Sequence, residues 1–297
     1  MNQSKKYWIS TNFAIQKEAR DVLNEYLLNL KLSYKAEATI TKYKSILEQF
    51  LSECTIPIDQ LTSDDVFNWI EKYSENKKEK TMDLVLSTLS SFFKFCLAED
   101  YMDKMVLKKR WRPKIPQSLP KFLNEQEYSR VKMASEKLSL RDRGLILFLF
   151  SSGCRQSEVA HLKIEDIDLN KRVAKVVGKG SKIRNVHFSI ECAIVLKEYL
   201  NTRNYKQSDP LFLNRWGQHL QKNGIYKVVK RVGELSGLTF TLHPHCCRHT
   251  FATNLLARGA DLKFIADELG HTNLNTTRVY ARIPSEDMIQ AYQNIMG

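Results

Sequence analysis

The most informative stretch of the chain, residues 242–283, reads LHPHCCRHTFATNLLARGADLKFIADELGHTNLNTTRVYARI. Gly259 and Gly270 are typical helix ends, so we expect one helix up to Gly259, a second from Asp261, and a third carrying the tyrosine of RVYARI. Four side chains of this stretch suit attack on a phosphodiester: His245, Arg248, His271 and Tyr280. Cations offset the charge that develops on phosphate oxygens while a hydroxyl attacks the phosphorus.

The charge of the chain is uneven. The 297 residues carry a net charge of +13, and 43% of them are hydrophobic, which suffices for a sizeable core and favours two domains. Residues 1–112 hold 18 Lys and Arg against 16 Asp and Glu, and the remainder holds 28 against 17. This asymmetry indicates an anionic partner for the second part, nucleic acid first, with a solubilising surface as the alternative.

Composition also argues against several classes of protein. We find no run of about 18 apolar residues, so no membrane-spanning helix is expected. The start, MNQSKKYWIS, has no apolar signal-peptide core, and we expect a cytoplasmic protein without a membrane partner. The six cysteines form no CxxC pair, which favours reduced thiols. We expect no zinc or other metal and no cofactor.

The first part of the chain reads as a small helical bundle. After an N-terminal extension over residues 1–16, apolar positions recur with helical period through the region 17–107. The four expected helices cover residues 17–32, 38–54, 64–74 and 80–100. Thr39 or Thr41 is the expected N-cap of the second, and Ser63-Asp64 caps the third.

A basic linker over residues 108–120, KKRWRPKIPQSLP, separates the two parts. It combines five Lys and Arg with three prolines, which oppose regular helix and strand. We interpret it as an extended strap that could follow a phosphate backbone. A solvated linker is the alternative.

The second part, residues 121–297, is predicted to be mainly helical with one small hairpin. Asn124 and Glu127 form a capping-box pattern. The apolar run 144–154 reads as a buried helix, and a short helical segment follows it. The alternating segment 172–189 predicts two strands that turn at 178–181, and helices resume near 190–203 and 221–235.

Two further side chains complete the candidate chemistry. Arg155 follows the apolar helix and would be close to buried unless it met a phosphate or a carboxylate, which Glu158 could supply. Lys179 lies at the tip of the predicted hairpin, where it could protonate a leaving oxygen. Each candidate also has an ordinary structural explanation, such as a packed tyrosine or a solvated lysine.

Four segments together resemble the successive conserved boxes of the tyrosine recombinases of the phage integrase or Xer type: SSGCRQSEVAHL, VVGKGSKIRNVHF, HPHCCRHTFATNLLARGADLKFIADELGH and NTTRVYARI. The resemblance covers nearly the whole chain. It implies a SAM-like core-binding domain over 17–107, a catalytic domain over 121–297, and a two-domain C-shaped clamp around DNA. The chain departs from the usual pattern at Cys154, Gln156 and the Cys246-Cys247 pair.

The resemblance also implies roles for the candidate residues. Arg155, Arg248 and His271 would bind the scissile phosphate, and Glu158 would support Arg155. Tyr280 would be the nucleophile that forms a covalent 3′-phosphotyrosyl link, Lys179 the general acid, and His245 an acid/base or hydrogen-bond partner.

The implied partner is a double-stranded DNA recombination site. A homotetramer would act on two sites with a dimer on each, or a hetero-tetramer with a second recombinase, and strands would be exchanged through a Holliday junction. The helix from Ser285 could dock on a neighbouring protomer or fold back on its own domain. The biological role would be chromosome dimer resolution or the integration, excision or resolution of a mobile element.

Nine cations are further candidates for contact with DNA: Lys42, Lys44, Lys108, Lys109, Arg110, Arg112, Lys182, Arg184 and Arg278. Each is individually just as well explained as a solvated surface charge. Two alternative functions stay open at this point, a type IB topoisomerase and a DNA-binding regulator whose catalytic site has decayed.

Overall fold

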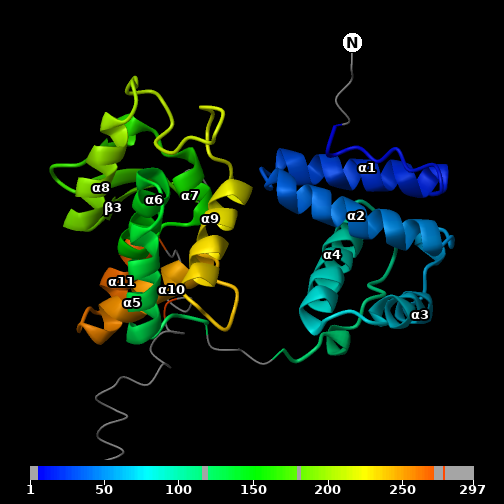
Figure 1. Ribbon diagram of the computed structural model, residues 1–297. Coiled ribbons are helices and arrows are strands. Elements are labelled where there is room, and N and C mark those ends of the chain that lie inside the picture. The colour runs from blue at the N-terminus through cyan, green and yellow to red at the C-terminus, as the bar shows by residue number, and fades with distance from the viewer. Residues whose placement is uncertain (1–5, 116–119, 179–181, 271–276, 278–297) are drawn as a thin grey trace, which may run out of the picture. The chain divides into compact units, whose positions relative to one another are not determined.

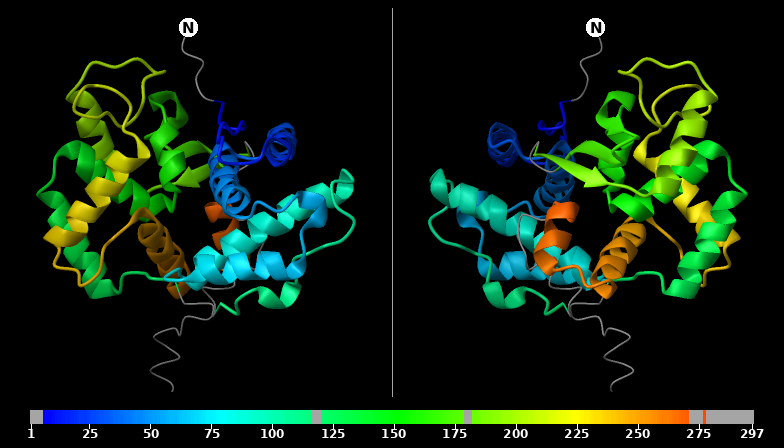
Figure 2. Two further views of the ribbon diagram at one scale, coloured as in Figure 1. Left: turned by 90° about the vertical axis from the view of Figure 1, so that its right-hand side faces the viewer. Right: turned by 90° about the vertical axis from the view of Figure 1, so that its left-hand side faces the viewer.

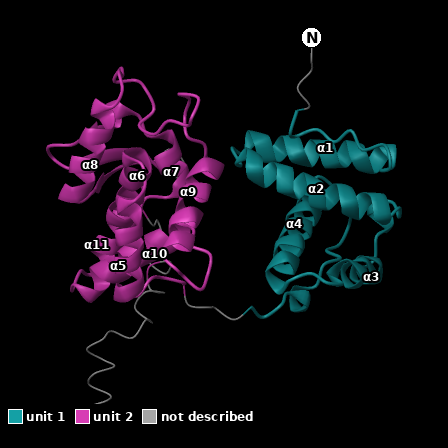
Figure 3. Cartoon of the chain, viewed as in Figure 1, with its two compact units in different colours: residues 1–117 teal, residues 118–297 magenta. Residues whose placement is uncertain are grey.

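The chain folds into two compact units. The computed structural model describes residues 6–115, 120–178, 182–270 and 277. Its first unit comprises residues 1–117 and its second residues 118–297 (Figure 3).

Four helices build the first unit, as the apolar periodicity predicts. They are α1 (Lys17–Leu32), α2 (Glu37–Glu53), α3 (Ser63–Ser74) and α4 (Glu79–Ala98), with a 3-10 turn at Ile58–Gln60 (Figure 1). Large aromatic side chains fill the centre: Phe50 of α2 lies edge-on to Phe93 of α4, and Tyr26 of α1 lies edge-on to Phe92. Burial of these rings supplies much of the apolar contact that holds the bundle together.

Helix α4 is long and apolar enough to span a membrane by length and composition alone. Half of its apolar window is buried inside the structure. Val85, Leu89 and Phe92 of this helix are completely shielded from solvent. Its apolar character is therefore accounted for by the core of the first unit.

Two expected helix caps were wrong by a few residues. Helix α2 starts earlier than Thr39 or Thr41, because the carbonyl of Ala36 already accepts hydrogen bonds from residues 39 and 40. The N-cap of α3 is Thr62 rather than Ser63-Asp64. Thr62 is extended and exchanges side-chain and backbone hydrogen bonds with Asp65 in a capping box, which satisfies two otherwise unpaired N–H groups.

The start of the basic linker is packed onto the first unit. A 3-10 turn forms at Lys109–Trp111, just before the first proline, where we had expected extended chain. The ring of Trp111 lies 5.3 Å from that of Phe67 in α3, and Arg112 lies 3.6 Å from Asp83 in α4. These contacts allow a turn where we expected extended chain, because the prolines constrain only the residues around and after Pro113.

The second unit is helical around a small sheet, as predicted. Its helices are α5 (Glu125–Glu136), α6 (Leu140–Ser152), α7 (Gln156–His161), α8 (Ile190–Asn201), α9 (Lys222–Leu235), α10 (Pro244–Ala257) and α11 (Leu262–Leu269). The capping box of Asn124 and Glu127 at the start of α5 is confirmed. Helix α6 is buried on nearly every side and packs against α8 and α10. The orange helices α10 and α11 lie against each other (Figures 1 and 2).

The sheet contains the predicted hairpin and one unexpected strand. Strands β2 (Val173–Val177) and β3 (Ile183–His187) are antiparallel, with Lys175 opposite Asn185. A 3-10 turn at Ile164–Asp166 leads into β1 (Ile167–Asp168), which pairs with β2 in the order β1-β2-β3. A strand of two residues is too short to show an alternating pattern, so sequence periodicity could not reveal it.

Candidate functional site

The junction between α6 and α7 positions the first candidate arginine. Gly153 ends α6 with φ of +60°, and a Cβ there would lie 2.3 Å from the ring of Phe251. Only glycine fits this turn without strain. The chain then extends through Arg155 before α7 begins, so its side chain leaves the end of the buried helix and remains 28% exposed.

Glu158 is the carboxylate that the sequence suggested for Arg155. Its Oε1 accepts from Nη1 of Arg155 at 2.8 Å, and its Oε2 accepts from the backbone N–H of the same residue at 2.8 Å. The carboxylate also accepts two hydrogen bonds from Arg184 of β3, at 2.8 and 3.0 Å. Glu158 therefore bridges two guanidinium groups.

The environment keeps Glu158 ionised. Its side chain is only 1% exposed. Burial by itself would raise the pKa of this carboxyl, but hydrogen bonds from Arg184 and from the backbone of Arg155 lower the pKa below its ordinary value. A buried carboxylate with four such donors stays charged at neutral pH.

Arg248 enters from α10 and is 3% exposed. Its Nη1 donates to the carbonyl of Gly153 and its Nη2 donates to the carbonyl of Leu269, both at 2.7 Å. One guanidinium thus joins the ends of α6 and α11.

Three arginines converge on the end of α11. The carbonyl of Glu268 accepts from Nε of Arg184 at 3.1 Å, and the carbonyl of Gly270 accepts from Nη2 of Arg155 at 3.3 Å. The carbonyl between them, of Leu269, accepts from Arg248 as described above. The last carbonyls of a helix have no partner within it and carry partial negative charge, which explains why cations gather there.

Three histidines lie around the start of α10. His243 is the N-cap, and its Nδ1 accepts from the backbone N–H of Cys246 at 3.2 Å. His245 reaches the surface one helical turn before Arg248. Partial burial and then the charge of Arg248 lower the pKa of His245, while burial and then the nearby His245 lower the pKa of His249 to about 4.

The structure therefore brings together four of the predicted site residues, Arg155, Glu158, His245 and Arg248, from α7, its preceding turn and α10. Lys179, His271, Tyr280 and Arg278 lie outside the described residues, as does the predicted terminal helix. Their described neighbours on the chain belong to this region. A Cβ added at Gly178 would lie 3.4 Å from Arg184 and 3.6 Å from Glu158, and the carbonyl of Gly270 accepts a hydrogen bond from Arg155. Thr277 is buried.

The predicted DNA contacts fall into two groups. Lys42, Lys108, Lys109, Arg110 and Lys182 are exposed at the surface. Three others have partners within the protein, although Arg112 is exposed as well. Lys44 donates to the carbonyl of Ile9, Arg112 pairs with Asp83, and Arg184 has a side chain only 14% exposed against Glu158.

Arg184 was predicted to be a surface cation, and its contacts with Glu158 and Glu268 were not predicted. The pair of His187 and Glu268, whose Nδ1 and Oε1 atoms lie 2.8 Å apart between β3 and α11, was not predicted either. The available signal was the strand alternation, which puts Arg184 and Val186 on one face of β3.

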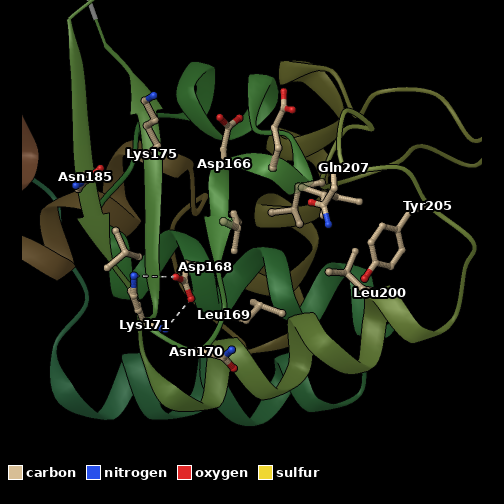
Figure 4. A pocket seen from close by; sticks show the side chains of 15 residues that line it. Asp166, Asp168, Leu169, Asn170, Lys171, Lys175, Asn185, Leu200, Tyr205 and Gln207 are labelled. Carbon is tan, nitrogen blue, oxygen red and sulfur yellow. Dashed lines mark hydrogen bonds and ion pairs between the residues drawn. The ribbon is translucent and has the colours of Figure 1, made fainter.

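Of the hollows on the described part of the second unit, two share Lys175 of β2 in their walls. One, of about 580 Å³, is lined by Arg155, Glu158, Lys175 and Gly178 among others, and so adjoins the candidate site. Another, of about 730 Å³, contains none of the predicted residues (Figure 4). There Lys171 pairs with Asp168, and charges of both signs line the wall (Figure 4). Of these two hollows, only the first adjoins the candidate site.

All six cysteines are free thiols, and five are buried. Burial raises the pKa of Cys154 to about 12 and that of Cys246 to about 11. These thiols are therefore protonated and unreactive at neutral pH. In the part of the chain that the structure describes, no group of three or more His, Cys, Asp or Glu side chains could hold a metal ion.

Comparison with protein families yields two matches. Residues 121–286 match the phage integrase family, and residues 23–100 match the N-terminal SAM-like domain of phage integrases. Tyrosine recombinase XerA of Pyrococcus horikoshii is 33% identical over 279 residues, covering 92% of this chain and 93% of that protein. Tyrosine recombinase XerC of Staphylococcus saprophyticus is 33% identical over 280 residues, covering 91% and 95%.

Solved structures agree on the fold. The XerH site-specific recombinase, in a post-cleavage complex with a palindromic difH substrate, superposes with a TM-score of 0.77 at 22% identity over 97% of this chain and 91% of that one. The XerA recombinase structure has a TM-score of 0.54 at 26% identity, covering 94% and 99%.

Proposed function

Because the chain belongs to the phage integrase family of tyrosine recombinases, we propose that it cuts and rejoins DNA at specific sites through a covalent 3′-phosphotyrosyl intermediate. The observation that carries the proposal is the convergence of Arg155 and Arg248 on the end of α11, directly before His271. Two fixed guanidiniums close together suit the non-bridging oxygens of one phosphate. The alternatives, a type IB topoisomerase and a decayed regulator, gain no support from the relatives.

In the proposed reaction the hydroxyl oxygen of Tyr280 attacks the scissile phosphorus. The new bond joins the tyrosine oxygen to phosphorus, and the bond from phosphorus to the 5′ oxygen breaks. Lys179 gives the departing 5′ oxygen a proton, which leaves a 5′ hydroxyl. Attack by a 5′ hydroxyl from the exchanged strand reverses these steps and releases Tyr280 without an external energy source.

The histidine beside the arginines has a defined part in this scheme. The lowered pKa of His245 leaves its ring neutral at pH 7, and a neutral ring can accept the phenolic proton or a hydrogen bond. His271, with Arg155 and Arg248, would stabilise the charge on the five-coordinate phosphorus.

We propose that both units bind double-stranded DNA and that exposed cations follow its phosphates. The candidates that the structure leaves exposed are Lys42, Lys108, Lys109, Arg110, Arg112 and Lys182. Neutralised phosphates release counterions, so affinity should fall steeply with salt. The strong positive charge of the second part of the chain supports this partner.

The assembly and location follow from the same chemistry. Strand exchange between two sites requires a protomer at each of four cleavage points, so we propose a homotetramer, with a second recombinase as an alternative partner. The helix from Ser285 would dock on a neighbouring protomer. We also propose a cytoplasmic location, which agrees with a DNA substrate.

Covalent trapping tests the function. The protein is incubated with a pool of nicked duplexes whose arms have random sequence, and the trapped DNA is sequenced. We expect an adduct with a preferred sequence. Tyr280→Phe should abolish the adduct and keep DNA binding, and Tyr205→Phe is the matched control at an exposed tyrosine.

Two results would contradict the proposal. An adduct that survives Tyr280→Phe would remove the tyrosine from its role, and an adduct with no sequence preference would favour a topoisomerase. EDTA should leave adduct formation intact, because the proposed site uses only side chains.

A further inference from the structure

We propose that Arg184 is a positioning residue for strand cleavage rather than a DNA contact, an inference that rests on the proposed function. Through Glu158, Arg184 fixes the orientation of the guanidinium of Arg155. Through the carbonyl of Glu268, it holds the end of α11 in place. It thereby connects three parts of the proposed active site: the first arginine, the hairpin before Lys179, and the end of α11 before His271.

The connection to Arg155 runs through a shared oxygen atom. Oε1 of Glu158 accepts from Nη1 of Arg155 and from Nη1 of Arg184, each at 2.8 Å. Nη2 of Arg184 bonds the second oxygen at 3.0 Å, so Arg184 makes the bidentate contact and Arg155 the single one. The planar fork of Arg184 fixes the plane of the carboxylate, which in turn fixes the direction of Arg155.

The connection to α11 uses the remaining face of the same guanidinium. Nε of Arg184 donates to the carbonyl of Glu268 at 3.1 Å. The neighbouring His187 lies 2.8 Å from the carboxylate of Glu268, so β3 contacts this residue through both its backbone and its side chain. The side chain of Glu268 is mostly buried. Strand β3 thus sets where α11 ends.

The hairpin turn lies over the same group. Gly178 closes the hairpin by donating its N–H to the carbonyl of Lys182 at 2.7 Å. A Cβ at Gly178 would lie 3.4 Å from Nη1 of Arg184 and 3.6 Å from Oε1 of Glu158. The ion pair between Arg184 and Glu158 therefore lies next to Gly178, the residue that precedes Lys179.

The ion pair with Glu158 argues against a direct contact between Arg184 and DNA, whereas burial alone would not, because Arg248 is more deeply buried. All three nitrogens of its guanidinium group donate to protein oxygens, and the side chain is only 14% exposed. To reach a phosphate it would have to leave Glu158 as a buried carboxylate bonded to a single arginine, which is costly. The positive charge serves the protein interior.

The test measures cleavage and affinity separately. Arg184→Gln and Arg184→Lys are compared with the wild type on a nicked duplex of the sequence selected by covalent trapping. We expect both variants to cleave about 10- to 100-fold more slowly at saturating protein, because small displacements of catalytic groups cost rates of this order. The dissociation constant should stay within about threefold. Lysine keeps the charge but lacks the fork, so it should not rescue cleavage.

A second substrate separates positioning from general loss of structure. In a methylphosphonate at the scissile position, one charged oxygen is replaced by a methyl group, so the transition state depends less on Arg155. Relative to the wild type on that substrate, the Arg184→Gln defect should shrink to about threefold or less. For each variant, the ratio of the cleavage rates on the two substrates does not depend on the fraction of the protein that is folded. Lys171→Gln removes an exposed cation from the turn between β1 and β2 and is the control.

The outcomes are distinguishable. Wild-type rates for both Arg184 variants would overturn the inference, and so would an equal defect on both substrates. Full cleavage at saturation with weakened affinity, rescued by lysine, would make Arg184 a DNA contact instead. Failure of the wild-type protein to form any adduct would overturn the proposed function itself.

Discussion

The guanidinium of Arg248 donates a 2.7 Å hydrogen bond to the carbonyl of Leu269, two residues before His271. The same group bonds the carbonyl of Gly153, two residues before Arg155. Arg248 therefore holds two of the chain segments that lead into the proposed active site. Arg248, which we expect to bind the scissile phosphate, therefore also holds the chain segments around the site in place.

Loss of Arg248 should reduce both stability and cleavage. In Arg248→Ala the buried carbonyls of Gly153 and Leu269 lose their arginine partner, at about 1–3 kcal/mol each. Urea denaturation should show the second unit unfolding at lower denaturant, and the covalent adduct should be lost. Arg215→Ala, at an exposed arginine of the same unit, should change the free energy of unfolding by no more than about 0.5 kcal/mol. Unchanged stability of Arg248→Ala would contradict the framework role.

Gly153→Ala should be far more damaging than Gly259→Ala. Both glycines have positive φ, which costs an alanine about 1 kcal/mol. At 153 the added Cβ would also lie 2.3 Å from the Phe251 ring, whereas at 259 it would meet nothing within 4 Å. We expect a loss of about 2–4 kcal/mol for Gly153→Ala against about 1 kcal/mol for Gly259→Ala in chemical denaturation. Similar losses of stability in the two variants would mean that the positive φ accounts for both and that the close approach to Phe251 has no effect.

Stability should fall with acidification because of His249. Burial lowers its pKa from 6.5 to about 4, so between these values the unfolded chain binds a proton that the folded protein does not. The free energy of unfolding should therefore be level above about pH 6.5. Below that pH it should fall by up to about 1.4 kcal/mol per unit until about pH 4. His249→Gln should flatten this slope, and an unchanged slope would show that other groups cause it.

Lys179→Ala should slow cleavage, and a better leaving group should restore the rate. Without the proposed general acid, the 5′ oxygen must depart as a poor alkoxide. A duplex with sulfur in place of the bridging 5′ oxygen provides a leaving group that needs no proton. On that substrate the variant should approach the wild-type rate in single-turnover assays. A defect of equal size on both substrates would exclude the acid role.

Much of the fold was readable from local patterns. The helix over residues 17–32 was predicted with its observed limits, and the hairpin 172–189 and the cap at Asn124 were also correct. These features depend on apolar period and on short-range hydrogen bonds, which a single sequence displays. The cap of α3 was misplaced by one residue, since Thr62, Ser63 and Asp64 are all residue types that cap helices well.

The chain by itself determined which residue types are available for phosphoryl transfer, because their identities and their order are visible in the sequence. It also indicated that Arg155 needs a carboxylate, since Glu158 lies one helical turn away. Only the tertiary structure decided what Arg184 does. Its partners Glu158 and Glu268 lie 26 and 84 residues away along the chain. No local periodicity encodes such distances, and burial is what turns a hairpin cation into an internal ion pair.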